Sequence, residues 1–213
     1  MQNYDHIRGA ARENLCRFLA ACYYEPGPEF GEERVFDSMT DAASRIDADF
    51  ADRARRLGRH FSETGPDRLL RDYTRLFLGP IDILAKPYAS VWLEPGSSGL
   101  MQESTMAVTA LYEEGGFDIA EDFRELPDHI AAELEFLYLL INRQNQAQQS
   151  ADAPALAEPD GLRRRFLQNH LGRWVGSFTA AMRTGATEAF YRELADLTER
   201  FVAEEVTFAG GMT

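Results

Sequence analysis

Apolar residues along this chain recur at helical spacing, three or four positions apart, in almost every segment. The stripes lie in residues 7–22, 69–77, 101–112, 130–141, 162–178 and 190–202. Strict alternation of apolar and polar residues, the pattern of a half-buried strand, is scarce. The sequence therefore predicts an all-α protein.

Two stretches refine this picture. Residues 134–141 are apolar on nearly all sides, which predicts a central helix with neighbours around its circumference. Residues 144–161, QNQAQQSADAPALAEPDG, are polar and rich in Ala and Pro, and they carry no strong apolar stripe. We expect a flexible connector or hinge there, inside a single multi-helix domain that spans residues 1–213.

A long segment without a helical pattern, FLGPIDILAKPYASVWLEPGSSGL, covers residues 77–100 and is rich in Gly, Pro and aromatic residues. Long loops in compact domains are often functional. Pro87, Tyr88 and Trp92 could form a rigid recognition surface, because Tyr and Trp bury much area with few rotatable bonds. The alternative is that Tyr88 and Trp92 anchor the loop to the core.

Composition narrows the classes of function. With 213 residues, of which 45% are hydrophobic, the chain can fill a sizeable core. A net charge of -13 argues against binding a nucleic-acid backbone and favours a basic partner. The first residues do not form a secretion signal, and no apolar stretch approaches the roughly 20 residues of a membrane span. We therefore expect a cytoplasmic protein.

Few residues suggest catalysis or metal binding. Asp128, His129 and Glu133 lie close in sequence, and a small helical metal-dependent hydrolase that uses these three is one alternative. No second HxxxE or ExxH element, nucleophile elbow, Walker loop or dinucleotide fingerprint is present. We therefore predict no catalytic residue, metal ligand or cofactor. Cys16 and Cys22 are predicted to be core thiols, since their spacing puts them on different faces of a helix.

The stretch ELPDHI, residues 125–130, directly precedes the apolar helix pattern. Pro127 fits a first helical turn, and Asp128 would place negative charge against the positive end of that helix. A helix start does not explain His129, because a cation is unfavourable there. Contact with a partner, or a buried and hydrogen-bonded ring, would explain it.

Three blocks in this order resemble the TorD/DmsD/NarJ family of chaperones for molybdenum- or tungsten-containing oxidoreductases. The blocks are YTRLFLGP (73–80), PYASVW (87–92) and ELPDH followed by ELEF (125–136). The C-terminal segments FLQNHLGRWVGSF and EAFYRELADLTERF resemble the family's last helices more weakly. Pro127 stands one position later than the proline that is usual in the family.

The resemblance implies a TorD-like helical bundle that is a cytoplasmic chaperone and not an enzyme. It implies binding to the twin-arginine signal peptide of an apo-form molybdopterin-dependent oxidoreductase, which is held back from export until its cofactor is inserted. Such a leader is basic and then apolar, so its receptor should offer carboxylates beside an aromatic groove. The resemblance also implies which residues bind the client. Tyr73, Leu76 and Phe77 would form an apolar floor, and Pro87, Tyr88 and Trp92 would form the loop wall. Asp128 and His129 would form the polar end.

Three questions stay open at this point. Some members of the family exchange helices between subunits. A monomer and a dimer that swaps helices at residues 144–161 are both compatible with the sequence, and the monomer is favoured. Some members have been linked to guanine nucleotide or molybdenum cofactor, and the sequence decides neither. Residues 163–168, RRRFLQ, resemble a twin-arginine core; we interpret them as part of an amphipathic helix, with a self-mimic of the leader as the alternative. A generic helical adaptor is the remaining alternative function.

Overall fold

Helices account for nearly all the regular structure of the chain in a computed structural model, which describes residues 2–27, 29–79, 83–96, 102–120, 123–150 and 153–211. In chain order they are α1 (Gln2–Ala21), α2 (Glu29–Glu32), α3 (Val35–Ser44), α4 (Ala48–Thr64), α5 (Pro66–Tyr73), η1 (Thr74–Leu78), α6 (Ala89–Leu93), α7 (Glu103–Glu114), α8 (Ile130–Ser150), α9 (Ala153–Phe166), η2 (Leu167–Leu171), α10 (Gly172–Gly185) and α11 (Ala189–Gly210). The described residues form no strand beyond one isolated bridge, so the all-α prediction is confirmed.

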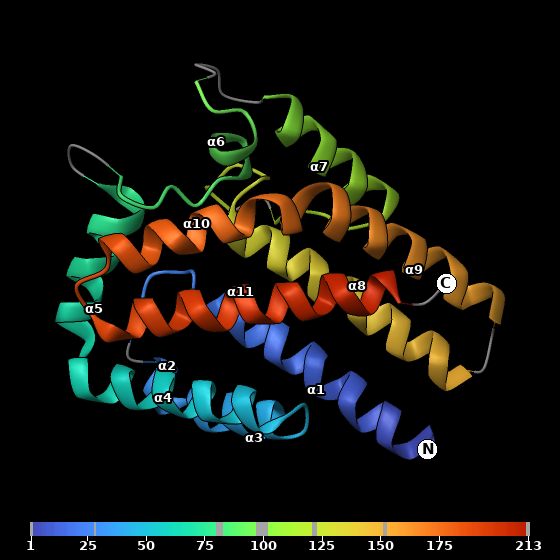
Figure 1. Cartoon of the computed structure of the whole chain (residues 1–213), viewed down its shortest axis with the longest axis horizontal. Helices are drawn as coiled ribbons and strands as arrows, with labels where there is room; N and C mark the ends of the chain where they lie inside the picture. Colours follow the sequence, from blue (N-terminus) through green and yellow to red (C-terminus); the bar gives the residue numbers. More distant parts are fainter. Residues whose placement is uncertain are drawn as a thin grey trace.

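The helices pack around a continuous apolar core. α8 packs against α1 and α9, and α11 lies between α10 and α4 (Figure 1). Leu134, Leu137 and Leu140 of α8 are fully buried, which confirms the prediction of a central helix. Within the described ranges, no helix is both long enough and apolar enough to cross a bilayer.

Both cysteines are buried free thiols, as predicted. Cys16 donates a hydrogen bond to the Leu134 carbonyl at 3.3 Å, which joins α1 to α8. Burial raises the pKa of Cys22 to about 12, so this thiol stays protonated at neutral pH.

The connector expected at residues 144–161 is largely helical. α8 continues to Ser150 and α9 begins at Ala153; only residues 151–152 separate the helices, and these lie outside the described ranges. Gln144 is buried and donates its side-chain amide to Asp160 Oδ1 at 2.8 Å, which joins α8 to α9. A connector without regular structure is therefore wrong for residues 144–150 and 153–161, because Gln and Ala favour helix even where the apolar stripe is weak. A hinge between the two helices stays a prediction.

The RRRFLQ segment forms the end of α9 and the start of η2. Arg163 is buried and pairs with Glu205 of α11 at 2.9 Å, and Arg165 pairs with Glu114. Phe166 and Leu167 are fully buried in the core. These side chains have partners within the fold, so the amphipathic-helix interpretation is confirmed.

Glu205 also joins α11 to α1. Arg12 donates to both carboxylate oxygens of Glu205 at 2.6 Å, so two guanidinium groups share one buried carboxylate. The guanidinium carbons of Arg12 and Arg163 lie 4.2 and 5.2 Å from the ring centroid of Phe208. This cluster fixes α1, α9 and α11 against one another through paired charge and cation–π contact.

Candidate functional site

The blocks PYASVW and ELPDH, which are far apart in sequence, lie side by side. Tyr88 and His129 form an antiparallel bridge. The Ala89 N–H donates to the Asp128 carbonyl at 2.9 Å. Backbone pairing therefore holds the two loops together and fixes their side chains relative to each other.

Asp128 caps α6 and not α8, the helix expected from the sequence. Its Oδ2 accepts from the Ser90 N–H at 2.9 Å, and its carbonyl accepts from the preceding Ala89 N–H. The carboxylate thus lies at the positive N-terminus of α6. Asp128 is fully buried, and its Oδ1 has no hydrogen-bond partner among the described residues. The helix that it caps begins 39 residues earlier, a pairing that local spacing could not reveal.

His129 is the side chain that caps α8. Its Nδ1 accepts from the Ala131 N–H at 3.2 Å, and its ring packs against Tyr88 and Phe123, with centroids 5.4 and 6.2 Å away. Burial lowers the pKa of His129 to about 4 despite nearby carboxylates. The imidazole is therefore neutral at physiological pH and avoids placing a cation at a helix N-terminus.

This pKa predicts a pH dependence of stability. Between about pH 6.5 and 4 the unfolded state protonates His129 and the folded state does not, so the free energy of unfolding should fall as the pH falls. In His129→Asn the amide oxygen can accept the same N–H without titrating, so this component should disappear. Urea denaturation of both proteins at pH 7 and 4.5 measures it. Equal losses of stability in the two proteins would contradict the assignment.

Tyr88 and Trp92 are partly exposed and also anchored. The Tyr88 hydroxyl donates to Glu125 Oε2 at 2.5 Å, and the Trp92 indole N–H donates to the Lys86 carbonyl at 2.9 Å. Burial and the hydrogen bond to Glu125 raise the pKa of Tyr88, so its phenol stays protonated at neutral pH. Each ring therefore offers an oriented, partly open face.

The other expected contact residues lie deeper. Tyr73, Leu76 and Phe77 are at most 8% exposed, and the Tyr73 and Phe77 rings pack edge to face with centroids 5.2 Å apart. Pro87 is also buried. These four side chains support the loops from beneath in this structure, and their contact with a partner stays a prediction.

A hollow of about 480 Å³ opens beside Glu125, and we call it the acidic groove. Its lining combines aromatic and aliphatic side chains with carboxylates, namely Tyr24, Phe117, Ile119, Phe123, Asp118, Glu125 and Glu135. Of the lining residues that the structure describes, three are carboxylates and one, Arg124, is basic. The groove suits a ligand that carries positive charge beside apolar groups.

Two tyrosines orient the carboxylates of the acidic groove. Tyr24 donates to Glu135 Oε1 at 2.6 Å, and Tyr88 donates to Glu125. An ionised carboxylate accepts about four hydrogen bonds, so each retains capacity for a further donor. Sequence reasoning missed Tyr24 and Glu135 because Tyr24 lies in the turn after α1 and Glu135 lies in α8, far apart in the sequence. Only the net acidity indicated such a surface.

Glu133 belongs to a separate buried network. Its Oε1 lies 2.8 Å from His170 Nε2, and its Oε2 accepts from the Trp174 indole N–H at 3.0 Å. His170 lies in η2, the π-helical turn that brings α9 into α10. Among the described side chains, no three His, Cys, Asp or Glu residues are arranged to hold a metal ion. Glu133 thus stabilises the contact between α8 and α10 through buried hydrogen bonds.

The sequence of this chain is similar to one protein family and to several known proteins. The family model described as nitrate reductase delta subunit matches residues 43–180. The chain is 31% identical over 134 residues to the chaperone protein TorD of Vibrio parahaemolyticus, which covers 62% of this chain and 60% of that protein. It is 30% identical to the TorD chaperone of Photobacterium profundum, over 67% of this chain and 64% of the relative.

A third relative carries a different name. The perchlorate reductase assembly chaperone protein of Dechloromonas aromatica is 29% identical over 71% of each chain. The matches with the first two relatives span somewhat less than two thirds of those proteins' length. The family match includes Glu125 and Glu135 of the acidic groove, and also Tyr88, which donates to Glu125, but it begins after Tyr24.

Proposed function

This chain belongs to the nitrate reductase delta subunit family, and we propose that it is a cytoplasmic maturation chaperone for a molybdenum- or tungsten-containing oxidoreductase. In this proposal it binds the twin-arginine leader of the apo-enzyme until the cofactor has been inserted. The names of its relatives, which are chaperones and assembly chaperones, support this class of function over an enzyme.

The observation that carries the proposal is the acidic groove. A twin-arginine leader presents guanidinium groups followed by an apolar stretch. Glu125 and Glu135 would accept from the guanidinium groups, and Tyr24 and Phe123 would pack against the apolar side chains that follow. Charge-assisted hydrogen bonds of this kind are shorter and stronger than neutral ones.

The two loops support this groove. Tyr88 orients Glu125 of the groove, and Trp92 on the same segment offers a second partly open aromatic ring. Asp128 and His129 hold these loops in place by capping α6 and α8. In the proposal Asp128 and His129 therefore affect leader binding by positioning the loops, since both side chains are buried and each accepts a hydrogen bond from a backbone N–H group.

Titration of a synthetic twin-arginine leader into the purified protein tests the proposed function. Replacing both leader arginines with glutamine should weaken binding about thirtyfold, which corresponds to about 2 kcal/mol. Binding of the native leader should also weaken as salt is added, because the Debye length shortens. Equal dissociation constants for the two leaders would contradict the proposal and favour a generic helical adaptor.

A further inference from the structure

A second hollow, of about 540 Å³, lies between α3 and α4, and we call it the basic groove. Among the side chains that the structure describes, three arginines line it, Arg34, Arg55 and Arg59, together with one carboxylate, Asp37. The chain as a whole has a net charge of -13, so this local excess of positive charge runs opposite to the rest of the molecule. A cationic groove on an acidic protein would attract an anionic ligand.

The guanidinium groups of this groove are available to a ligand. Arg34 pairs with Asp37 at 2.7 Å and Arg55 with Asp52 at 2.5 Å, and all four side chains are at least 60% exposed. Exposed pairs of this kind contribute about 0–1 kcal/mol, so an incoming carboxylate can replace the partner. Arg59 is exposed and makes no ion pair with any residue that the structure describes.

The floor of the basic groove is aromatic and rigid. Phe36 and Phe61 pack with ring centroids 4.7 Å apart, and Phe30 lies about 6 Å from both. Gly58 lets α4 approach closely, since an added Cβ would lie 2.7 Å from the Phe36 Cβ. Phe30 and Phe36 are each only 8% exposed and Phe61 is partly exposed, so the floor offers a small apolar surface beside the arginines, which suits a peptide segment with both acidic and apolar residues.

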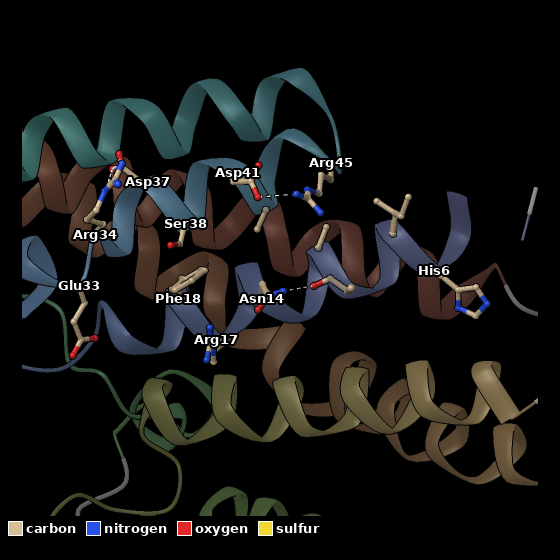
Figure 2. Close-up of a pocket in the computed structure, with 14 residues that line it drawn as sticks. His6, Asn14, Arg17, Phe18, Glu33, Arg34, Asp37, Ser38, Asp41 and Arg45 are labelled. Carbon is tan, nitrogen blue, oxygen red and sulfur yellow. Dashed lines mark hydrogen bonds and ion pairs between the residues drawn. The ribbon is translucent and has the colours of Figure 1, made fainter. Parts of the chain in front are cut away.

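The other side of α3 differs. A hollow of about 740 Å³ lies between α1 and α3. There Arg34 lies beside Asp37, and Arg45 pairs with Asp41 (Figure 2). Its lining contains equal numbers of arginines and carboxylates, three of each. The excess of positive charge is thus specific to the α4 side, which distinguishes the basic groove from a generally charged surface.

The two charged grooves are close along the chain. Tyr24 lines the acidic groove and Phe30 lines the basic groove. Six residues span at most about 20 Å even when fully extended, so Tyr24 and Phe30 cannot lie farther apart than that. Tyr24 and Phe30 are therefore within the reach of one extended polypeptide of about six residues or more.

We propose that the basic groove binds an acidic, apolar-containing segment of the same client whose leader occupies the acidic groove. This inference rests on the proposed function for the identity of the client. A second contact of opposite charge would raise affinity by making the second binding event intramolecular. It would also set the direction in which the client chain lies across the chaperone.

The test uses a short synthetic peptide of Asp, Glu, Leu and Phe residues as the acidic probe, alongside the twin-arginine leader. Arg55→Glu/Arg59→Glu should weaken the acidic probe at least about tenfold and leave leader binding unchanged. The matched control is Arg71→Glu/Arg173→Glu, which reverses two exposed arginines on α5 and α10 and should change neither affinity. Melting temperatures of both variants verify that they fold.

Four outcomes decide between the possibilities. Equal weakening by the groove and control variants would show a general charge effect and overturn the proposal. A wild-type protein that does not bind the acidic probe would also overturn it. Self-association that Arg55→Glu/Arg59→Glu abolishes would assign the groove to a second copy of the chain and also overturn it. A leader that fails to bind while the acidic probe binds at the groove would contradict the proposed function alone and leave the acidic-segment site standing.

Discussion

Replacing Glu205 with alanine is expected to lower the free energy of unfolding by about 3–5 kcal/mol. Glu205, Arg12 and Arg163 are all buried, and the one carboxylate accepts hydrogen bonds from both guanidinium groups. Its removal leaves two like charges in the interior without a counter-charge. The loss should appear in urea denaturation as a lower midpoint with an unchanged slope.

The neighbouring residue Glu204 provides the control. It pairs with Arg8 at 2.8 Å and with Arg200 at 2.9 Å, but these side chains are partly exposed to solvent. Glu204→Ala should therefore cost about 0–1 kcal/mol. Similar losses for the two variants would contradict the view that the buried cluster, and not surface charge, holds α1, α9 and α11 together.

Reversing the charge of the acidic groove is expected to weaken leader binding by about a hundredfold or more. In Glu125→Lys/Glu135→Lys two groups that would accept from the leader's guanidinium groups become repulsive, and effects of this kind amount to about 3 kcal/mol or more. The stability of the fold should change little, because both side chains are only partly buried. Calorimetric titration with the twin-arginine leader measures the change.

A matched charge reversal on α7 distinguishes an effect of the acidic groove from an effect of the protein's net charge. Glu103→Lys/Glu113→Lys makes the same change of net charge at two exposed positions outside the groove. It should slow association slightly and leave the dissociation constant within about twofold. Equal weakening by the two reversals would show that net charge, and not the groove, controls affinity.

Helical periodicity was sufficient to predict much of the fold. The apolar run at 134–141 correctly indicated a central helix, because a helix that is apolar all round must be surrounded. The polar composition around Gln144 indicated a flexible connector or hinge, whereas Gln144 lies inside α8. Gln144 is buried through a hydrogen bond to Asp160, and a satisfied polar side chain leaves no apolar signal in the sequence.

The candidate site was predictable only in part. The resemblance singled out the two loops that carry Tyr88 and His129, and these loops meet in the structure. Their contact with a client stays a prediction. Local spacing assigned Asp128 to the nearest helix, whereas the carboxylate caps a helix from the other loop. Tyr24 and Glu135 were missed, because a groove assembled from separate helices has no local sequence pattern.

The most direct test of the central claim is a charge swap between the acidic groove and its leader. Dissociation constants would be measured for wild type and Glu125→Lys/Glu135→Lys, each with the twin-arginine leader and with a leader whose two arginines are replaced by glutamate. The account predicts that each single change weakens binding strongly and that the two changes together restore much of the affinity, which is the coupling expected for groups in direct contact. Losses that simply add in the doubly changed pair would contradict recognition of the leader's arginines by Glu125 and Glu135.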